Sequence, residues 1–196
     1  MTRVMAFSDL HARADLVPAL VDAAGTADLV IGAGDFCNLR RGLAEVMAML
    51  SPLADKAILV CGNAESAAEL AAATPATVLH GTGTRAAGLA LFGLGCAVPP
   101  TPFGDWSCDL TEAEAAALLA PMGRVDILVT HAPPKAVADL SSSGRSLGST
   151  AILAAIETMQ PSFCLCGHIH DSWGQRGHIG ATEVINLGPQ PVILEL

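Results

Sequence analysis

The chain has 196 residues, only 10 lysines and arginines, and a formal net charge of −9 at pH 7. This length is enough to bury an extensive core, and we predict a single domain over residues 1–196. Proteins that bind nucleic acids or anionic membranes use basic surfaces, and no basic stretch is visible in this sequence. We therefore expect no nucleic-acid and no membrane partner. An acidic chain that handled a phosphorylated substrate would need a local positive charge, such as a metal centre.

The N-terminal residues and the cysteines favour a cytoplasmic location. The first ten residues, MTRVMAFSDL, contain charged and polar residues and lack the apolar core of a signal peptide. The longest uncharged run, residues 86–104, is interrupted by glycine and proline and makes a poor membrane span. The 6 cysteines have irregular spacings and do not resemble a secreted disulfide framework. A homodimer is compatible with the sequence, which does not fix the oligomeric state.

Strand-like apolar runs alternate with helix-like patterns in the first part of the chain. In chain order, we predict a strand at Arg3–Phe7, a helix at Arg13–Ala24, a strand at Leu29–Ala33, a helix at Gly42–Leu50, a strand at Ala57–Cys61 and a helix at Glu65–Ala73. This alternation is typical of βαβ units in a largely parallel sheet.

The pattern changes at Thr77. Short runs at Thr77–His80 and Leu89–Leu94 lie among glycines and predict hairpins, and therefore a second or mixed sheet. The remaining predicted elements are a helix from the capping box at Thr111 to about Ala120, a strand at Val125–Thr130, a helix from Ser149 to about Met159, a strand at Phe163–Cys166, and closing strands within residues 183–187 and 191–196. The Ser- and Gly-rich loop Pro133–Ser149 is of a length typical of lids or mobile segments.

The stretch CLCGHIH places Cys164, Cys166, His168 and His170 at alternate positions. Along an extended chain, these residues would span roughly 20 Å at about 3.3 Å per residue. A zinc ion holds its ligands at about 2.0–2.3 Å, so one ion cannot bind all four. We therefore interpret the cysteines as small buried residues of a strand. The histidines beyond the end of the strand then need partners from elsewhere in the chain.

Polar residues recur at the carboxyl ends of the predicted strands, where open α/β sheets bind their ligands. These residues are Asp9, His11, Asp35, Asn63, His131, His168 and His170. Each one has an ordinary explanation as a helix cap, a turn residue or a loop residue. Their order and placement together predict that seven metal-competent side chains meet in one crevice.

In this order, the motifs DLH, GD, GNAE, THAPP and GHIH resemble those of the calcineurin-like metallophosphoesterase superfamily. The resemblance extends from Asp9 to the final strands, and the second half of the chain is most similar to the small microbial members. It implies an α/β fold, namely a four-layer α/β/β/α sandwich of two mixed sheets flanked by helices.

The resemblance also implies a dinuclear metal site and a phosphoesterase activity. One divalent ion would be held by Asp9, His11 and His170, the other by Asn63, His131 and His168, and Asp35 would bridge them. Carboxylate and imidazole ligands suit Mn, Fe, Zn or Ni, and the sequence does not choose among these metals. The expected reaction is hydrolysis of a small phosphoester, in particular a phosphodiester, by a hydroxide that bridges the two metals.

One position departs from the family pattern. The family usually places His after the Asn, as a proton donor to the leaving group and a phosphate contact, whereas this chain has Ala64 followed by Glu65. Ala64 can neither donate a proton nor bind phosphate, so the proton donor is unknown. The alternative function is a metal-binding scaffold that keeps the fold without turnover. The substrate stays open among cyclic nucleotides, other phosphodiesters, protein phosphates and nucleotides.

Two other enzyme classes find little support. Residues 144–148 spell G-x-S-x-G, with Asp171 and His178 downstream, but no strand precedes them, as a nucleophile elbow requires. The glycine pairs at 32–34 and 93–95 lack the third glycine of a dinucleotide-binding loop.

Several further residues have two interpretations. Trp173 could stack on a substrate ring, although packing is the better expectation, and Lys135 and Arg145 could contact phosphate or face solvent. Cys37 could border the site or be a buried thiol. His80 matches no family position and stays unassigned.

Overall fold

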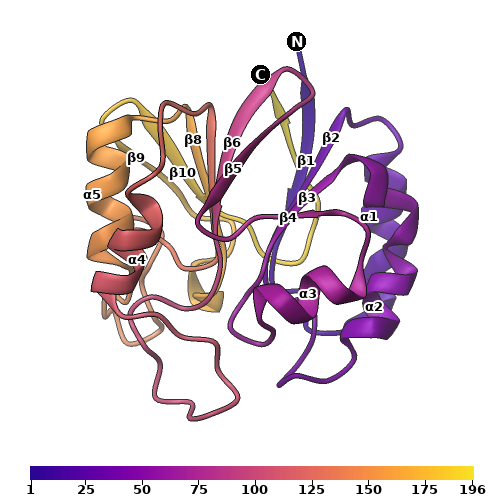
Figure 1. Ribbon diagram of the computed structural model, residues 1–196, viewed down its shortest axis with the longest axis horizontal. Coiled ribbons are helices and arrows are strands. Elements are labelled where there is room, and N and C mark those ends of the chain that lie inside the picture. The colour runs from indigo at the N-terminus through magenta and orange to yellow at the C-terminus, as the bar shows by residue number, and fades with distance from the viewer.

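The computed structural model describes residues 1–196 and contains two mixed β-sheets that pack face to face (Figure 1). The first sheet has the order β11-β1-β2-β3-β4, with β1 at Arg3–Phe7, β2 at Leu29–Ala33, β3 at Ala57–Val60, β4 at Thr77–Val78 and β11 at Val192–Glu195. The second has the order β5-β6-β7-β8-β10-β9, with β5 at Thr82–Ala86, β6 at Leu89–Leu94, β7 at Ile127–Thr130, β8 at Phe163–Cys166, β9 at Arg176–Ile179 and β10 at Thr182–Asn186. Antiparallel strands lie at one edge of the first sheet and at both edges of the second.

Helices cover the outer faces of both sheets, so the predicted four-layer α/β/β/α sandwich is confirmed (Figure 1). The first sheet carries α1 at Val17–Ala24, α2 at Leu43–Met49 and α3 at Ala67–Ala73, and the second carries α4 at Glu112–Leu119 and α5 at Thr150–Met159. Three short 3-10 helices lie at Ala14–Leu16, Ser51–Lys56 and His170–Ser172. No helix has the length and apolar character that crossing a bilayer requires.

The central strands are apolar on both faces because both faces are buried. In β1, Val4 and Ala6 belong to the core between the two sheets, and Met5 and Phe7 belong to the core beneath α1 and α2. A third core lies between the second sheet and its helices. Parallel strands buried on both sides are typically such continuous apolar runs. This explains why the sequence predicts β1, β2 and β8 at their observed bounds.

The predicted hairpin at Thr77–His80 is wrong. Its first two residues form β4, which pairs in parallel with β3 at the edge of the first sheet. The hairpin is made instead by β5 and β6. The sequence does not reveal β5, because Thr82–Ala86 is half exposed and has no apolar alternation. The helix predicted at Arg13–Ala24 is a 3-10 turn followed by α1, which has Pro18 in its first turn, where a missing N–H costs no hydrogen bond.

The helices of the second sheet are joined at their N-termini by Glu112. Its carboxylate accepts hydrogen bonds from Ser149 Oγ at 2.7 Å, Thr150 N at 2.9 Å and Ala151 N at 2.8 Å. Ser149 Oγ also accepts from Ile152 N, which confirms the predicted cap of α5. Glu112 therefore satisfies free N–H groups at the start of α5 from the first turn of α4.

The loop Pro133–Ser149 is organised around the buried carboxylate of Asp139. Asp139 Oδ2 accepts from Ala136 N at 3.0 Å, Ser146 Oγ at 2.5 Å and Gly148 N at 2.9 Å. Ser146 thus has a carboxylate partner and no imidazole partner, which excludes the G-x-S-x-G interpretation. Lys135 Nζ donates to the carbonyl of Ser146 at 2.7 Å and is engaged within the loop.

Five of the six cysteines are buried, and Cys108 is half-buried. Cys37, Cys61, Cys164 and Cys166 are free and fully buried, as the sequence predicts for the strand cysteines. Cys96 and Cys108 form a disulfide. The irregular spacing gave no signal for this pair because the two residues are brought together by the loop between β6 and α4.

Candidate metal centre

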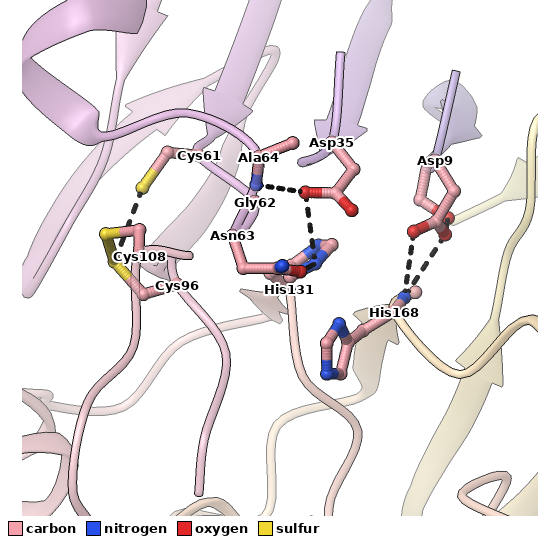
Figure 2. A network of polar contacts seen from close by, with 12 residues as sticks. Asp9, Asp35, Cys61, Gly62, Asn63, Ala64, Cys96, Cys108, His131 and His168 are labelled. Atoms are coloured by element: carbon pink, nitrogen blue, oxygen red, sulfur yellow. Dashed lines mark hydrogen bonds and ion pairs between the residues drawn. A yellow bond between two sulfur atoms is a disulfide. The ribbon is translucent and has the colours of Figure 1, made fainter. Parts of the chain in front are cut away.

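All seven predicted site residues meet where the two sheets present the carboxyl ends of their parallel strands. Asp9 and His11 follow β1, Asp35 follows β2, Asn63 follows β3, His131 follows β7, and His168 and His170 follow β8. Figure 2 shows Asp35, Asn63 and His131 turned toward one another, with Asp9 and His168 beside them. The first sheet therefore supplies both carboxylates, the amide and one imidazole, and the second supplies three imidazoles.

Four of these residues have a backbone conformation that is unusual for non-glycine residues. Their φ angles are 52° at Asp9, 47° at His11, 55° at Asp35 and 69° at His168. Such angles cost energy and persist where surrounding contacts hold the backbone. Here, Asp9 N donates to the carbonyl of Gly34 and His11 N to that of Asp35, both at 2.9 Å. The loops after β1 and β2 thus hold each other in place.

Two motif glycines are required by close approach. A Cβ on Gly62 would lie 2.0 Å from Asp35 Oδ1 and 2.1 Å from Asp35 N. A Cβ on Gly167 would lie 2.4 Å from Asp9 Oδ2. The glycine before Asn63 and the glycine before His168 therefore leave the space that the two carboxylates occupy.

Asp35 lies between two groups of side chains. Its Oδ2 is 3.5 Å from His11 Nε2, and its Oδ1 is 3.5 Å from His131 Nε2. Ligand atoms of Asp9, His11 and His170 lie within 4.8 Å of one another, as do those of Asp9, Asp35 and His131. The carboxylate of Asp35 thus lies between the two groups of side chains that would hold cations.

The group around Asp9 brings together two imidazole nitrogens and a fixed carboxylate. His11 Nε2 and His170 Nε2 are 3.1 Å apart, and His170 Nε2 is 3.8 Å from Asp9 Oδ1. Asp9 Oδ2 accepts from Ser8 Oγ at 2.5 Å and from Trp173 Nε1 at 3.1 Å. These donors orient the carboxylate, whose Oδ1 accepts from His168 N at 3.0 Å and also faces the His170 ring. Trp173 therefore has the packing role, beside the His170 ring.

The group around His131 contains acceptors that face each other. His131 Nδ1 lies 2.9 Å from the carbonyl of Ala33, so this nitrogen carries the proton and Nε2 has the free lone pair. Nε2 lies 3.1 Å from Asn63 Oδ1, and Asn63 Nδ2 donates to Ser107 Oγ at 3.0 Å. The His168 ring lies beside that of His131, with centroids 4.9 Å apart. Converging lone pairs of this kind fit a divalent cation.

The ionisation of three of the four imidazoles fits cation binding. Burial lowers the pKa of His11, His168 and His170, which keeps these imidazoles neutral and able to bind metal. Burial acts to lower the pKa of His131, but neighbouring carboxylates outweigh it and raise this pKa. Burial raises the pKa of the Asp35 carboxyl, and a nearby cation would reverse that shift.

Comparison with known proteins identifies the family. Residues 2–192 match the family model of the calcineurin-like phosphoesterase superfamily domain. The chain belongs to this superfamily. It is 28% identical over 199 residues to an uncharacterized protein of Methanocaldococcus jannaschii, which covers 96% of the chain and 88% of that protein. It is 32% identical over 88 residues to a UPF0046 protein of Caenorhabditis elegans, over 40% of the chain and only 22% of that protein.

The fold is shared with solved calcineurin-like phosphoesterase structures. A dimetal phosphatase from Danio rerio superposes with a TM-score of 0.67 at 16% identity, over 96% of this chain and 88% of that one. At this identity, the likeness establishes the fold. Together with the converging ligand atoms, the family membership identifies the chain as a phosphoesterase-family protein with candidate metal-binding residues.

Glu65 positions the loops of this phosphoesterase-family site. Its fully buried carboxylate accepts from Asp35 N at 2.9 Å, Gly62 N at 2.7 Å and Cys37 N at 3.2 Å. Burial, followed by the charge of Asp35, raises the pKa of Glu65. The acidic residue of the GNAE motif thus joins the turn of Asn63 to the loop of Asp35. The sequence does not reveal this role, because the Asp35 and Cys37 main-chain groups that Glu65 binds are 30 and 28 residues away.

Asn186 is a second positioning residue that the sequence does not single out. Its buried side-chain amide donates to the carbonyls of Ala138, Gly167 and Ile169 at 3.0–3.2 Å. It thereby ties β10 and the loop Pro133–Ser149 to the GHIH segment. The sequence does not predict this role, because Asn186 lies within the largely apolar run EVINL.

A cavity of about 470 Å³ opens in front of the candidate metal centre of this phosphoesterase-family protein. On one side it is lined by His11, Asp35, Asn63, His168 and His170. The facing wall is formed by Pro99, Pro100, Pro102, Phe103 and Trp106, and the last two rings stack with centroids 5.4 Å apart. No lysine or arginine lines the cavity. Arg145 is exposed and lies outside it.

Ala64 occupies the position at which the sequence departs from the family pattern. Its N–H donates to Asp35 Oδ1 at 2.8 Å, its carbonyl accepts from Cys37 Sγ at 3.0 Å, and its residue is only 1% exposed. The methyl group is buried and does not line the cavity. Cys37 is therefore a buried thiol beneath this turn.

Proposed function

We propose that this protein is a dinuclear metal-dependent phosphodiesterase acting on small phosphodiesters. The placement of Asp35 supports this proposal most directly, because its two oxygens each lie 3.5 Å from an imidazole of a different group. A carboxylate placed in this way is suited to share two cations. The family membership makes a phosphoester the expected substrate.

In this proposal, each cation is held by residues of both sheets. Asp9, His11 and His170 hold one ion, Asn63, His131 and His168 hold the other, and Asp35 contacts both. Two divalent ions, when bound, clamp the phosphoryl oxygens, neutralise developing charge and lower the pKa of the attacking water. The donors on Asp9 and the Ala33 carbonyl on His131 keep these ligands oriented before substrate binds.

The lining of the cavity favours a diester over a monoester. A phosphate monoester carries a charge close to −2 at pH 7, and its recognition usually draws on Arg or Lys. The cavity has no such side chain and instead presents three prolines, Phe103 and Trp106. A diester carries one negative charge and a second organic group, which this apolar wall accommodates.

Ala64 restricts the substrates further. Without an imidazole at this position, the usual proton donor of the family is missing, and general acid catalysis typically contributes about 10²–10⁴-fold. Aryl oxyanions are stable without that proton. We therefore infer a preference for diesters with acidic leaving groups.

The test is hydrolysis of matched aryl and alkyl phosphodiesters and monoesters by protein loaded separately with Mn²⁺, Fe²⁺, Zn²⁺ or Ni²⁺. We expect turnover of aryl diesters that is lost on removing the metal and in Asp35→Asn. The alternative is a non-catalytic metal-binding scaffold, which the missing proton donor at Ala64 favours. Stoichiometric metal binding with no ester cleaved under any metal would establish the scaffold and refute the phosphodiesterase.

A further inference from the structure

A second cluster of metal-competent side chains lies on the other side of the Asn63 turn from the cavity. Cys61 follows β3, His80 follows β4, Cys96 follows β6, and Cys108 lies in the loop that returns to the turn. Figure 2 shows the three cysteines grouped together, separate from the Asp35 side of the turn. None of these four side chains lines the cavity, so the cluster is distinct from the candidate metal centre.

The spacing of the cluster matches a tetrahedral thiolate site. Ligand atoms of Cys61, His80 and Cys96 lie within 4.8 Å of one another, and the sulfurs of Cys61 and Cys96 are 3.9 Å apart. Two thiolates on a tetrahedral zinc ion, each about 2.3 Å from the metal, are about 3.8 Å apart. Cys108 is bonded to Cys96 and brings a third sulfur to the same place. Three cysteines and one histidine form a common set of structural zinc ligands.

The surroundings of the cluster are compatible with a metal site. A Cβ at Gly95 would lie 2.2 Å from Cys61 Sγ, so a glycine leaves room for this sulfur. Gly95 N donates to His80 Nδ1 at 3.2 Å, so Nδ1 carries the lone pair of the neutral ring and would exchange this hydrogen bond for a cation. Burial lowers the pKa of His80, so the imidazole is neutral near pH 7.

We propose that reduction of the Cys96–Cys108 disulfide by a small-molecule thiol opens a site for a thiophilic divalent cation such as Zn²⁺, held by Cys61, His80, Cys96 and Cys108. In the reduction, two thiols give two electrons and two protons to the protein disulfide and become one small-molecule disulfide. Cation binding then displaces the protons of the coordinating thiols. The disulfide and the full ligand set are mutually exclusive.

Both the disulfide and the proposed cation site would hold the segment between Cys96 and Cys108 against the candidate metal centre. Cys108 N donates to the carbonyl of Asn63 at 2.9 Å, and the adjacent Ser107 accepts from Asn63 Nδ2 at 3.0 Å. The segment between Cys96 and Cys108 also carries the proline and aromatic wall of the cavity. A cation in the thiolate site would hold this wall in place under reducing conditions, when the disulfide is absent.

Cobalt spectroscopy of the whole chain tests the proposal. Co²⁺ added anaerobically to reduced protein should give thiolate-to-cobalt charge-transfer absorption in the near ultraviolet, and protein with the disulfide intact should show much less. The candidate metal centre offers only oxygen and nitrogen ligands, so it gives no such absorption. Cys61→Ser and Cys108→Ser should each weaken the band, while Cys164→Ser, which alters a buried thiol of β8, should leave it unchanged.

Measuring the zinc content of the unsubstituted protein tests the proposal even where a variant fails to fold. Reduced protein should retain one more Zn²⁺ per chain than oxidised protein, and its partly exposed Cys108 should resist alkylation only when Zn²⁺ is present. Equal zinc content in the two redox states, or a reduced protein without thiolate-to-cobalt absorption, would overturn the proposal and leave Cys96–Cys108 as a simple disulfide.

Discussion

Gly62 lies so close to Asp35 that the methyl group added in Gly62→Ala should strongly disturb the candidate metal centre. In Gly62→Ala, the new Cβ would lie 2.0 Å from Asp35 Oδ1 and 2.1 Å from Asp35 N. Rotation of the Asp35 side chain can relieve the first contact, but the second involves the backbone, so the loop after β2 must move. Overpacking of this kind costs about 1–3 kcal/mol. For a chain of this size, the loss corresponds to a fall in Tm of about 2–12 °C.

Gly123→Ala is the matched control, because a Cβ at Gly123 meets nothing within 4 Å and neither glycine has a positive φ. Thermal unfolding of the metal-free proteins measures the loss of stability, and calorimetric Mn²⁺ titration measures cation binding. We expect Gly62→Ala to unfold at a lower temperature and to lose affinity for both ions, and Gly123→Ala to change neither. A Gly62→Ala protein with the Tm and Mn²⁺ affinity of the control would refute the close-approach argument.

Three further predictions address the ligands, the departure from the family pattern and the pH dependence of stability. Asp35→Asn should lower the Mn²⁺ content of both sites, whereas His170→Ala should mainly affect the site nearer Asp9; retention of both ions at unchanged affinity by Asp35→Asn would show that Asp35 does not bridge. The buried site of the Ala64 methyl group has no room for an imidazole, so in Ala64→His the ring should turn toward the cavity. Compared at equal metal content, this variant should then narrow the gap between aryl and alkyl phosphodiesters by accelerating the alkyl substrates within the roughly 10²–10⁴-fold range of general acid catalysis. An unchanged aryl-to-alkyl ratio would mean that an acid at position 64 does not limit turnover. Partial burial acts to raise the pKa of Glu112, but the hydrogen bonds that it accepts at the start of α5 outweigh burial and lower this pKa. A lowered pKa in the folded state stabilises the protein above the pKa of the unfolded state, and this stabilisation is lost as the pH falls through the folded-state pKa. Glu112→Gln should therefore be less stable than the parent in urea at neutral pH, with the difference shrinking in acid, and a pH-independent difference would contradict this reasoning.

The sequence predicts the parts of this protein in which local pattern and burial agree. β1, β2 and β8 are continuous apolar runs because both of their faces are buried, and their bounds are predicted correctly. β5 and β9 lie at the edges of the second sheet, where exposed polar residues remove the apolar pattern. The two-residue β4 is recognisable only from its partner strand, β3.

In the candidate site too, the sequence predicts the residues that follow a local pattern and misses those that depend on tertiary contacts. The seven candidate ligands are found because each one directly follows a predicted strand, and the carboxyl ends of parallel strands meet. The residues that hold them are not found, because Glu65 and Asn186 bind main-chain groups of other loops. The pairing of Cys96 with Cys108 likewise depends on the course of a loop that has no periodic pattern.

The division of the ligands between two sheets also sets an order of events during synthesis. Asp9, Asp35 and Asn63 leave the ribosome early, whereas His131 follows Asn63 by 68 residues. At about 5–20 residues per second, Asn63 waits roughly 3–14 s for this imidazole, and the carboxylates of Asp9 and Asp35, made earlier, wait longer. His168 and His170 follow later still. During that interval, His11 is the one histidine of the candidate centre that has been made, and the incomplete ligand set binds cations weakly and without selectivity. Selective cation binding therefore requires the residues that follow β8. A centre with both ions bound would indicate that both sheets have been synthesised and have packed together.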